Sequence, residues 1–365
     1  MYTDIIPGAN VYERDLLAWI DAARQEGLAI LKDEPAWDEM DKSIAYVMGE
    51  QIQKRPIQLA SVIDNRYKHI TIQTVSALTD IRPLFSYKTY NPYFYSTSAA
   101  LDKLATAWFI NSFADLRLAD ILKLAAVPGT GYGMLEWDPA ANQGVGDIVL
   151  RAVDPRNVIP IRPTFDGSVQ DWEGVIIQAS KSISELRARY PEYRDKLVPD
   201  NNPSVISRGW THWKHAMSKI ITPSAVDVLN DSNAKGAIKK MPTADLFQTY
   251  VKDRSIHSGP EPIQMGDPRT TWSYWVYPID FVMPNGQKAT EKEARLYPRG
   301  RLIISTKGCV LYDGPNPYWH GMFPIAKLTL EPWPWALLGT GIGKDLMPLQ
   351  DAINELINGI LDMAR

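Results

Sequence analysis

The sequence predicts an α+β fold, and three observations lead to this prediction. Apolar residues recur with helical spacing up to about residue 125. From Gly129 onward, short apolar or alternating runs end in Asp-Pro, Gly or Pro, which is typical of strands joined by tight turns. The chain also contains 27 prolines and 12 tryptophans, a composition that favours short strands and turns between helices over a helical bundle.

The N-terminal part of the chain contains four helical patterns. The pattern over 14–31 places on one face Leu16, Leu17, Ile20 and Ala23. Further helices are expected from Asp38 onward and over 66–80, and Pro83 limits how far the latter can extend. The fourth pattern covers 96–126, with Ser98 as its expected N-cap. Its apolar stripe consists of Leu101, Leu104, Ala105, Trp108 and Phe109.

Strand patterns follow this helical part. They lie at 131–139, 146–155, 157–163 and 172–180. A helix is expected again over 182–197. Beyond it, loops at 198–210 and 255–270 flank two further predicted helices, at 223–240 and 243–251.

The segment from Thr271 to Leu330 is again rich in strand patterns. The alternating run 271–283 ends in Pro-Asn-Gly, which predicts a hairpin with Asn285 and Gly286 in its turn. A second strand pair is expected on either side of Lys307 and Gly308.

The final segment, 344–365, is the clearest helical pattern in the sequence. One apolar face is formed by Leu346, Leu349, Ile353, Leu356, Ile357, Ile360 and Leu361. Pro348 is expected in the first turn, where its missing N–H has little effect. Gln350, Asn354 and Asn358 recur every four residues and form a row of amides beside that face. The pattern has no C-terminal stop signal, so we expect the sequence to be the N-terminal part of a longer protein.

Composition narrows the classes of function. The formal net charge is −3, so no overall positive field favours tight, salt-dependent binding of nucleic acid. The single cysteine, Cys309, leaves no internal disulfide framework and no multi-cysteine metal cluster. No run approaches the roughly 18 uninterrupted apolar residues expected of a membrane span.

Three glycines and a lysine precede the final helix, in the run Leu-Leu-Gly-Thr-Gly-Ile-Gly-Lys-Asp. A phosphate-binding P-loop aligned on Gly343 and Lys344 needs glycine at 338 and a hydroxyl at 345, but these positions hold Leu338 and Asp345. The dinucleotide-binding pattern needs a glycine where Lys344 stands. The sequence therefore predicts a turn with positive φ angles that starts the helix, with Asp345 as its cap.

The search for other chemistry gives no catalytic residue, no metal site and no cofactor. His212 and His215 have a spacing that allows metal binding on a helix, but no third ligand stands nearby, and their tryptophan neighbours favour packing. Cys309 is expected to be a buried strand thiol. The run 88–95 combines Lys88 with four aromatic residues, which can stack on bases, although a core or subunit contact is the favoured interpretation.

The order of these segments resembles a family. The runs "IQTVSALTDIRPLF", "GTGYGMLEWDP" and "VDPRNVIPI" precede the most specific part, 296–361. That part contains Tyr-Pro-x-Gly-Arg, a strand pair, Asn-Pro-Tyr, Phe-Pro, Gly-x-Gly and Leu-x-x-Gln-x-x-x-Asn, in this order. Together they resemble the portal proteins, or head–tail connectors, of tailed double-stranded DNA phages, over most of the chain beyond about residue 60.

This resemblance implies a ring, typically of twelve subunits, at one capsid vertex of the virion, assembled in the host cytoplasm. DNA passes through the ring, which contacts the capsid, the packaging terminase and adaptor or tail proteins, with no membrane partner. It also implies a wing over 1–180, an uncertain wing or first-stem region over 181–270, a clip over 271–330, and the start of the second stem helix over 331–365. The crown would lie in sequence beyond this chain.

The residues expected to contact the channel or another subunit are Lys344, Gln350, Asn354 and Asn358. Those expected to make clip contacts are Trp272, Tyr274, Trp275 and Tyr277. A stem that carries amides instead of a row of lysines suits DNA sliding, because each strong phosphate contact adds a barrier. ATP hydrolysis is expected to belong to a separate motor. Two alternatives remain, another phage neck or tail structural protein and a hydrolase that uses His212 and His215.

Overall fold

The computed structural model combines helices and antiparallel sheets, as the sequence predicts. It describes residues 12–51, 59–80, 85–139, 141–164, 168–200, 242–266, 273–284 and 286–364. The chain forms two compact units that interleave along the sequence. Unit 1 contains 1–29, 156–164 and 170–323, and unit 2 contains 30–155, 165–169 and 324–365. Neither unit is one continuous stretch of the chain. The wing, clip and stem boundaries expected from the resemblance stay a prediction.

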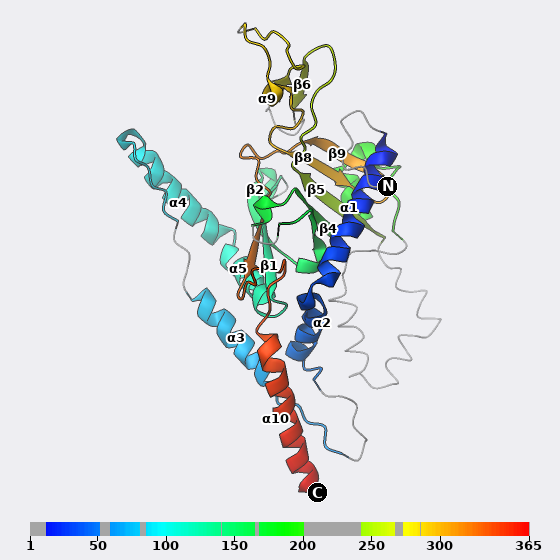
Figure 1. The fold of residues 1–365 in the computed structure, drawn as a ribbon. Coiled ribbons are helices and arrows are strands. Elements are labelled where there is room, and N and C mark those ends of the chain that lie inside the picture. The colour runs from blue at the N-terminus through cyan, green and yellow to red at the C-terminus, as the bar shows by residue number, and fades with distance from the viewer. Residues whose placement is uncertain are drawn as a thin grey trace. The chain divides into compact units, whose positions relative to one another are not determined.

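Unit 1 is built on a five-stranded antiparallel sheet in the order β3-β4-β5-β8-β9 (Figure 1). The strands are β3 (Val158–Ile161), β4 (Gly174–Ser182), β5 (Thr243–Val251), β8 (Arg301–Ser305) and β9 (Val310–Pro315). The predicted strand pair around Lys307 and Gly308 is confirmed as β8 and β9.

Helix α1 (Glu13–Asp33) contributes residues 13–29 to unit 1 and packs them on this sheet. Leu16 and Ile20 contact Ile303 of β8, and Ala23 joins a cluster with residues of β3, β4 and β5. A Cβ at Gly27 would lie 2.3 Å from the carbonyl oxygen of Pro160, so glycine permits the close approach of α1 to β3. The predicted face of this helix is therefore confirmed as the one that is buried.

The structure corrects the predicted helix at 243–251, because this segment is β5, the central strand of the sheet. All but two of its nine residues are buried. A short, continuously apolar run of this kind fits a buried strand as well as a helix, so its spacing alone cannot distinguish the two.

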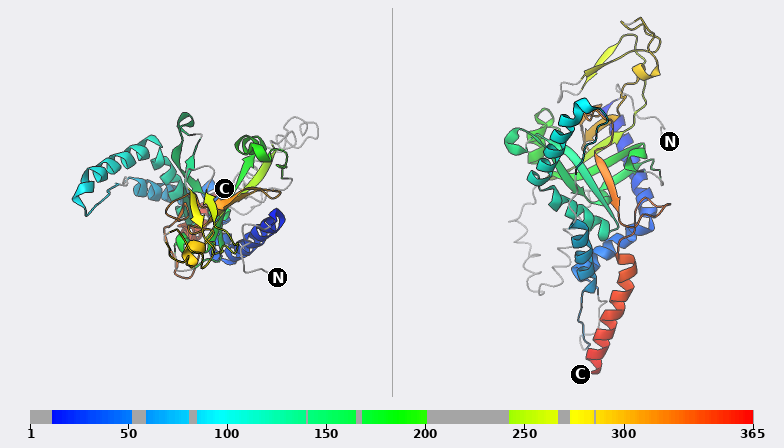
Figure 2. Two further views of the ribbon diagram at one scale, coloured as in Figure 1. Left: turned by 90° about the horizontal axis from the view of Figure 1, so that it is seen from above. Right: turned by 90° about the vertical axis from the view of Figure 1, so that its left-hand side faces the viewer.

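The remaining elements of unit 1 are short. They are α6 (Ile183–Arg189), the hairpin of β6 (Ile263–Gly266) with β7 (Ser273–Val276), and α9 (Glu291–Ala294), drawn in both views of Figure 2. The predicted loop at 255–270 thus contains β6, and β7 pairs with it. The predicted pairing across the Pro-Asn-Gly turn is formed by the residues after β7, because Val282 bridges Lys288 in antiparallel fashion and Met283 N donates to Gln287 O at 2.9 Å. Gly286 does lie in a turn, with φ of 78° and its N–H bonded to the carbonyl of Met283. Asn285 and the predicted helix at 223–240 lie outside the described residues.

Unit 2 contains a three-stranded antiparallel sheet in the order β10-β1-β2. The strands are β1 (Thr130–Asp138), β2 (Asp147–Val153) and β10 (Ile325–Thr329), and the helices are α2 (Pro35–Met48), α3 (Arg66–Thr79), α4 (Tyr95–Asn111), α5 (Ala114–Ala126) and α10 (Gly343–Met363). Single 3-10 turns in the chain are η1 (Pro92–Phe94), η2 (Asn142–Gly144), η3 (Pro155–Asn157), η4 (Val169–Asp171) and η5 (Pro191–Tyr193). Helix α5 packs against α3 through Val75, Leu122 and Ala126.

Two predicted helices of unit 2 differ in detail. The pattern over 96–126 is two helices, because Phe113 takes a left-handed conformation with φ of 52° between them. Ser98 is not the N-cap of α4, which begins at Tyr95, and its hydroxyl donates to the carbonyl of Tyr87. Helix α2 begins before Asp38, with Pro35 in its first turn, where proline is favoured. Pro83 lies outside the described residues.

Candidate functional site: the glycine turn and helix α10

The glycine run before α10 is a crossing point of backbone segments within unit 2. A Cβ at Gly341 would lie 2.2 Å from the carbonyl oxygen of Val127, and one at Gly339 would lie 2.9 Å from that of Glu331. A Cβ at Gly343 would meet the hydroxyl groups of Ser43 and Tyr67, both at 2.6 Å. None of the three glycines has a positive φ. The predicted positive-φ path is therefore wrong, and these glycines serve the close packing of the turn.

Most backbone N–H groups of this turn already have an acceptor inside unit 2. Gly339 N donates to the hydroxyl of Thr130 at 2.8 Å, and Ile342 N donates to the carbonyl of Ala126 at 3.0 Å. Thr340 N donates to Glu331 O at 3.3 Å. A phosphate loop needs these groups free to point at its ligand. This hydrogen bonding supports the interpretation of the run as a turn that starts a helix.

The N-cap of α10 lies three residues before the predicted one. The helix begins at Gly343 with Ile342 as its N-cap, so Asp345 lies in the first turn without capping it. Pro348 consequently lies inside the helix, beyond the first turn. The exposed Lys344 places its Nζ 5.5 Å from the ring centroid of Trp333, an arrangement suited to a cation–π contact.

The three predicted amides of α10 are buried within unit 2, with exposed fractions of 2% for Gln350, 4% for Asn354 and 1% for Asn358. They face the extended segment 59–65, which we call the strap. Asn358 both accepts from Val62 N (2.7 Å) and donates to Val62 O (2.9 Å). Its side chain thus pairs with the strap backbone as a neighbouring strand would.

The same pairing is repeated along the helix. Asn354 accepts from Asp64 N at 3.2 Å, and Asp362 accepts from Ala60 N at 2.6 Å. Gln350 donates to Asp64 O at 2.7 Å and accepts from Tyr67 N at 2.9 Å. We call this set of side chains, Gln350, Asn354, Asn358 and Asp362, the amide ladder.

The ladder depends on a match between two repeats. Four residues of an α-helix advance about 6.0 Å, while two residues of extended chain advance about 6.6 Å. Positions 354, 358 and 362 of α10 therefore stay level with positions 64, 62 and 60 of the strap. Because one amide offers both a donor and an acceptor, Asn358 satisfies both polar groups of Val62. The two polar groups of Asp64 are shared between Asn354 and Gln350, and the carboxylate of Asp362 only accepts.

A further contact holds α10 to α2. The hydroxyl of Tyr46 lies 2.7 and 2.8 Å from the two carboxylate oxygens of Asp351. Burial, then the hydrogen bond and the negative charge of Asp351, raise the pKa of Tyr46 to about 12. The ladder and this bond together fix which side of α10 faces the rest of unit 2.

The consequence is that leucines of α10 point away from the protein. Leu349, Leu356, Ile360 and Met363 are exposed, Leu356 by 67%. Within the apolar side, one set of residues is spaced alternately by three and four positions: Leu346, Leu349, Ile353, Leu356, Ile360 and Met363. We call this set the α10 seam. Its spacing is the 3.5-residue repeat that packs helix on helix with knobs in holes.

The placement of the amides differs from the one expected for channel or subunit contacts. They contact the chain's own strap, whereas the exposed Lys344 and the α10 seam are available to a partner. The strap and Asp362 were missed from the sequence. The signal that could have found them is the recurrence of a hydrogen-bonding side chain every four residues, at 350, 354, 358 and 362. The strap itself has no recognisable sequence pattern.

The candidate clip residues gather around β7 in unit 1. Trp275 is exposed by 54%, while Tyr274 is partly buried and its hydroxyl donates to the carbonyl of Leu296. Burial raises the pKa of Tyr274 above its ordinary value. Tyr277 stacks on Phe281 with ring centroids 5.8 Å apart. Trp272 lies outside the described residues. A clip contact of these residues stays a prediction.

The other sequence candidates give no second site. Cys309 is buried, as predicted, but it lies in the β8–β9 turn and not within a strand, with its sulfur 3.3 Å from the hydroxyl of Thr306. His212 and His215 lie outside the described residues. Within the described residues, no three His, Cys, Asp or Glu side chains are grouped so that they could hold a metal ion. None of the described helices has the length and apolar character to cross a membrane.

Comparison with known proteins adds no relative. No family model matches the sequence, and no curated protein matches it.

Proposed function

We propose that this chain is the subunit of an oligomeric ring of the phage portal type, a passive channel for DNA at one capsid vertex. In this proposal the ring docks the packaging terminase and the neck or tail proteins. Its residues make or break no bond. The proposal draws on the resemblance of 296–361 to portal proteins and on one structural observation, the exposed α10 seam.

The seam supports assembly because of how it is presented. Its exposed residues are large and apolar, and the amide ladder keeps them turned outward. The flanking positions, which correspond to e and g of a heptad, carry one charge, Asp345 in the first turn. The others are uncharged: Gln350, Ala352, Ile357, Gly359 and Ala364. Charges at such positions select or repel partner helices. Beyond the first turn of α10, identical copies of the helix therefore meet no like-charge repulsion at these flanking positions.

The glycine turn supports a passive role. Most of its N–H groups donate to acceptors within unit 2, and Asp345 holds a carboxylate where a P-loop places the hydroxyl that binds magnesium. Nucleotide hydrolysis by this turn is not part of the proposed function.

The experiment is to compare the assembly of the purified chain with that of Leu356→Glu. We expect the unaltered chain to sediment as a ring-sized oligomer and the variant to shift towards the single chain. The control is Glu355→Gln, an exposed position beside the seam, which should assemble as the unaltered chain does. Equal assembly of all three proteins would exclude the α10 seam as the contact.

Another neck or tail structural protein would share the composition and an exposed helix. Imaging separates the two functions, because particles without a central hole would favour that alternative over the portal proposal.

A further inference from the structure

We propose that helix α4 and the turn before it form an arm that packs against a second copy of this chain, at a contact separate from the α10 seam. The α4 arm is defined as residues 87–111. This inference rests on the proposed function in one respect, that copies of the chain assemble. It goes further in naming an element that holds them together.

Helix α4 has almost no partner within its own unit. Of its 17 residues, only Phe109 is buried. Asp102 and Lys103 are its only two charged residues. Leu104 is exposed by 66% and Ile110 by 59%. These two side chains lie about 120° apart around the helix, at about 100° per residue. A helix that is apolar on several sides is normally buried.

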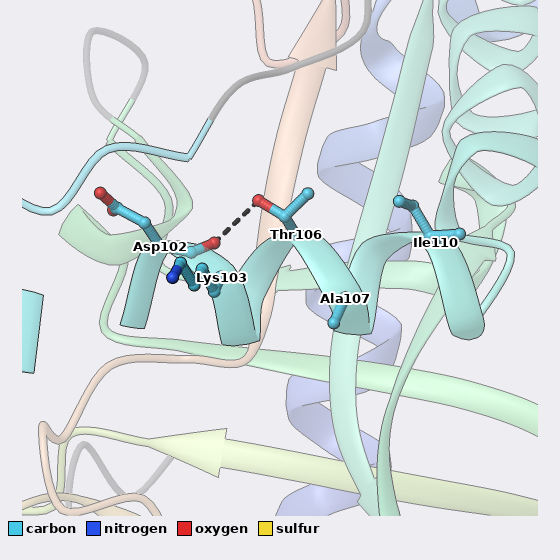
Figure 3. Close-up of a pocket in the computed structure, with 5 residues that line it drawn as sticks. All are labelled: Asp102, Lys103, Thr106, Ala107 and Ile110. Atoms are coloured by element: carbon cyan, nitrogen blue, oxygen red, sulfur yellow. Dashed lines mark hydrogen bonds between the residues drawn. The ribbon is translucent and has the colours of Figure 1, made fainter. Parts of the chain in front are cut away.

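One polar side chain of α4 bonds outside the arm, since the indole N–H of Trp108 donates to the carbonyl of Ile148 in β2 at 2.8 Å. Two others are used within the arm. Thr106 donates to the carbonyl of Asp102 at 2.8 Å, as Figure 3 shows, and the Asp102 carboxylate accepts from Tyr87 N at 2.6 Å. Asp102, Lys103, Thr106, Ala107 and Ile110 line an open depression of about 400 Å³. No array of convergent polar groups is left there to bind a small ligand, and the depression offers mainly apolar surface.

The tip of the arm displays aromatic side chains on an ordered turn. Tyr90 and Tyr93 are exposed by 102% and 90%, and Phe94 and Tyr95 by more than half. Asn91 holds the turn, since its side chain accepts from Tyr93 N at 3.1 Å. Tyrosine on a rigid turn is typical of protein contact surfaces, because it supplies large area with little loss of side-chain freedom. Of the two roles favoured for 88–95 from the sequence, a place in the core is therefore wrong. The other role, contact with a partner subunit, is still open.

The exposed area fits one side of a stable interface. At roughly 150–250 Å² per aromatic side chain, the four rings at the tip expose roughly 450–750 Å². Leu101, Leu104 and Ile110 add further apolar surface along the helix. A standard interface buries about 800 Å² on each partner, whereas the largest apolar patch of a typical monomer is about 300–600 Å².

The chemistry favours a second copy over other partners. A nucleic-acid strand requires several Lys or Arg residues, and the arm carries Lys88 and Lys103 against Asp102. An apolar surface of this size must be covered whenever the protein exists, because it promotes aggregation when it is free. A copy of the same chain is always present at the same concentration, and obligate interfaces are the more apolar class.

The arm also sets the type of contact. Its apolar residues lie on more than one side, so the neighbour must enclose it and cannot offer a single flat surface. An arm that enters a different surface of the next copy makes a head-to-tail contact, the type that closes into rings.

The first test is photocrosslinking by a photoreactive residue built into chosen positions of the chain, carried out in the assembled protein. A photoreactive phenylalanine analogue replaces Leu104 in one variant and Tyr93 in a second, and Lys42 on the exposed side of α2 in the control. Each variant is assembled from equal amounts of light and heavy isotope chains. We expect covalent dimers containing one light and one heavy chain from positions 104 and 93, and none from position 42.

The outcomes separate the arm from the proposed function. Rings that assemble but give only crosslinks within one chain from positions 104 and 93 would overturn the arm and leave the portal proposal standing. Crosslinks to added double-stranded DNA, with none between chains, would also overturn the arm. A chain that stays single at every concentration would overturn both.

A substitution gives an independent readout. Leu104→Asp should raise the concentration at half assembly at least tenfold, while the melting temperature of the single chain stays within the error of measurement because the side chain is exposed. Lys42→Gln on the exposed side of α2, outside the arm, should leave assembly unchanged. Loss of assembly in Lys42→Gln equal to that in Leu104→Asp, or no loss in either, would contradict the arm.

Discussion

Helices α1 and α10 each have 21 residues and an apolar side, but they bury opposite sides. Helix α1 places Leu16 and Ile20 against the five-stranded sheet, so its apolar residues are buried and its polar ones exposed. Helix α10 buries amides and exposes leucines. The difference lies in the surface that each helix meets. A sheet face offers apolar side chains, whereas the strap offers backbone N–H and C=O groups that must be hydrogen-bonded when buried.

The largest predicted effect comes from placing an aspartate at one apolar position in each of the two helices and comparing the stability of the two variants. Ile20→Asp places a charge in the core and should destabilise the chain by more than about 4 kcal/mol or prevent folding. Ile360→Asp, at an exposed position of the seam, should change the stability of the unassembled chain by no more than about 0.5 kcal/mol. Denaturant unfolding measures both. Similar losses in the two helices would contradict the outward orientation of α10.

The amide ladder itself predicts the next largest effect. Asn358→Leu removes the groups that bond both Val62 N and Val62 O, and should destabilise the chain by about 2–4 kcal/mol. Leucine is the more apolar residue, so a gain in stability would mean that the position packs against apolar groups. Glu355→Leu, one turn away and exposed, is the matched control and should have little effect.

The glycines provide a test of the turn. A Cβ at Gly341 would lie 2.2 Å from Val127 O, so Gly341→Ala must shift backbone and should destabilise the chain by about 1–3 kcal/mol. Gly359 lies in α10 with nothing within 4 Å of a Cβ. Gly359→Ala should therefore stabilise the unassembled chain by up to about 1 kcal/mol. Thermal unfolding of the two variants should move in opposite directions, and a shared direction would refute the close crossing.

The bond between α2 and α10 predicts a small, pH-dependent effect. The phenol of Tyr46 has a raised pKa of about 12 in the folded chain, against 10.0 ordinarily. Its contribution is therefore complete below pH 10 and lost as the pH rises through 12. Tyr46→Phe should lower stability by about 1 kcal/mol at neutral pH. The gap in melting temperature between the two proteins should close from pH 10 to 12, and a gap that persists at pH 12 would exclude this bond as its cause.

The smallest expected effect concerns nucleotides. The purified chain should show no ATP hydrolysis above background, and Lys344→Ala should leave that background unchanged. A phosphate-release assay measures both proteins. Turnover that the substitution abolishes would show that the glycine run holds a nucleotide.

The helices and most strands could be predicted because their side chains repeat with the period of the element. This holds for α1 and for the β8–β9 pair. Segment 243–251 could not be assigned in this way, since a strand buried on both faces loses its alternation. Phe113 splits the long helical pattern through a left-handed backbone conformation, which side-chain spacing does not encode.

The candidate site was predictable in composition but not in orientation. The amides at 350, 354 and 358 and the leucines beside them are visible in the sequence, and the usual rule places the leucines inside. In α10 the amides are inside instead, because the N–H and C=O groups of the strap need hydrogen-bond partners and the amides supply them. A segment without a pattern, about 290 residues away in sequence, carries no signal of this pairing.

The central claim is that copies of this chain assemble into a ring around an open channel. Negative-stain electron microscopy of the purified protein, taken over a range of concentrations, tests it most directly. The account predicts ring-shaped particles with a central hole that are lost in Leu356→Glu. A chain that remains single at every concentration, or particles with no hole, would contradict it.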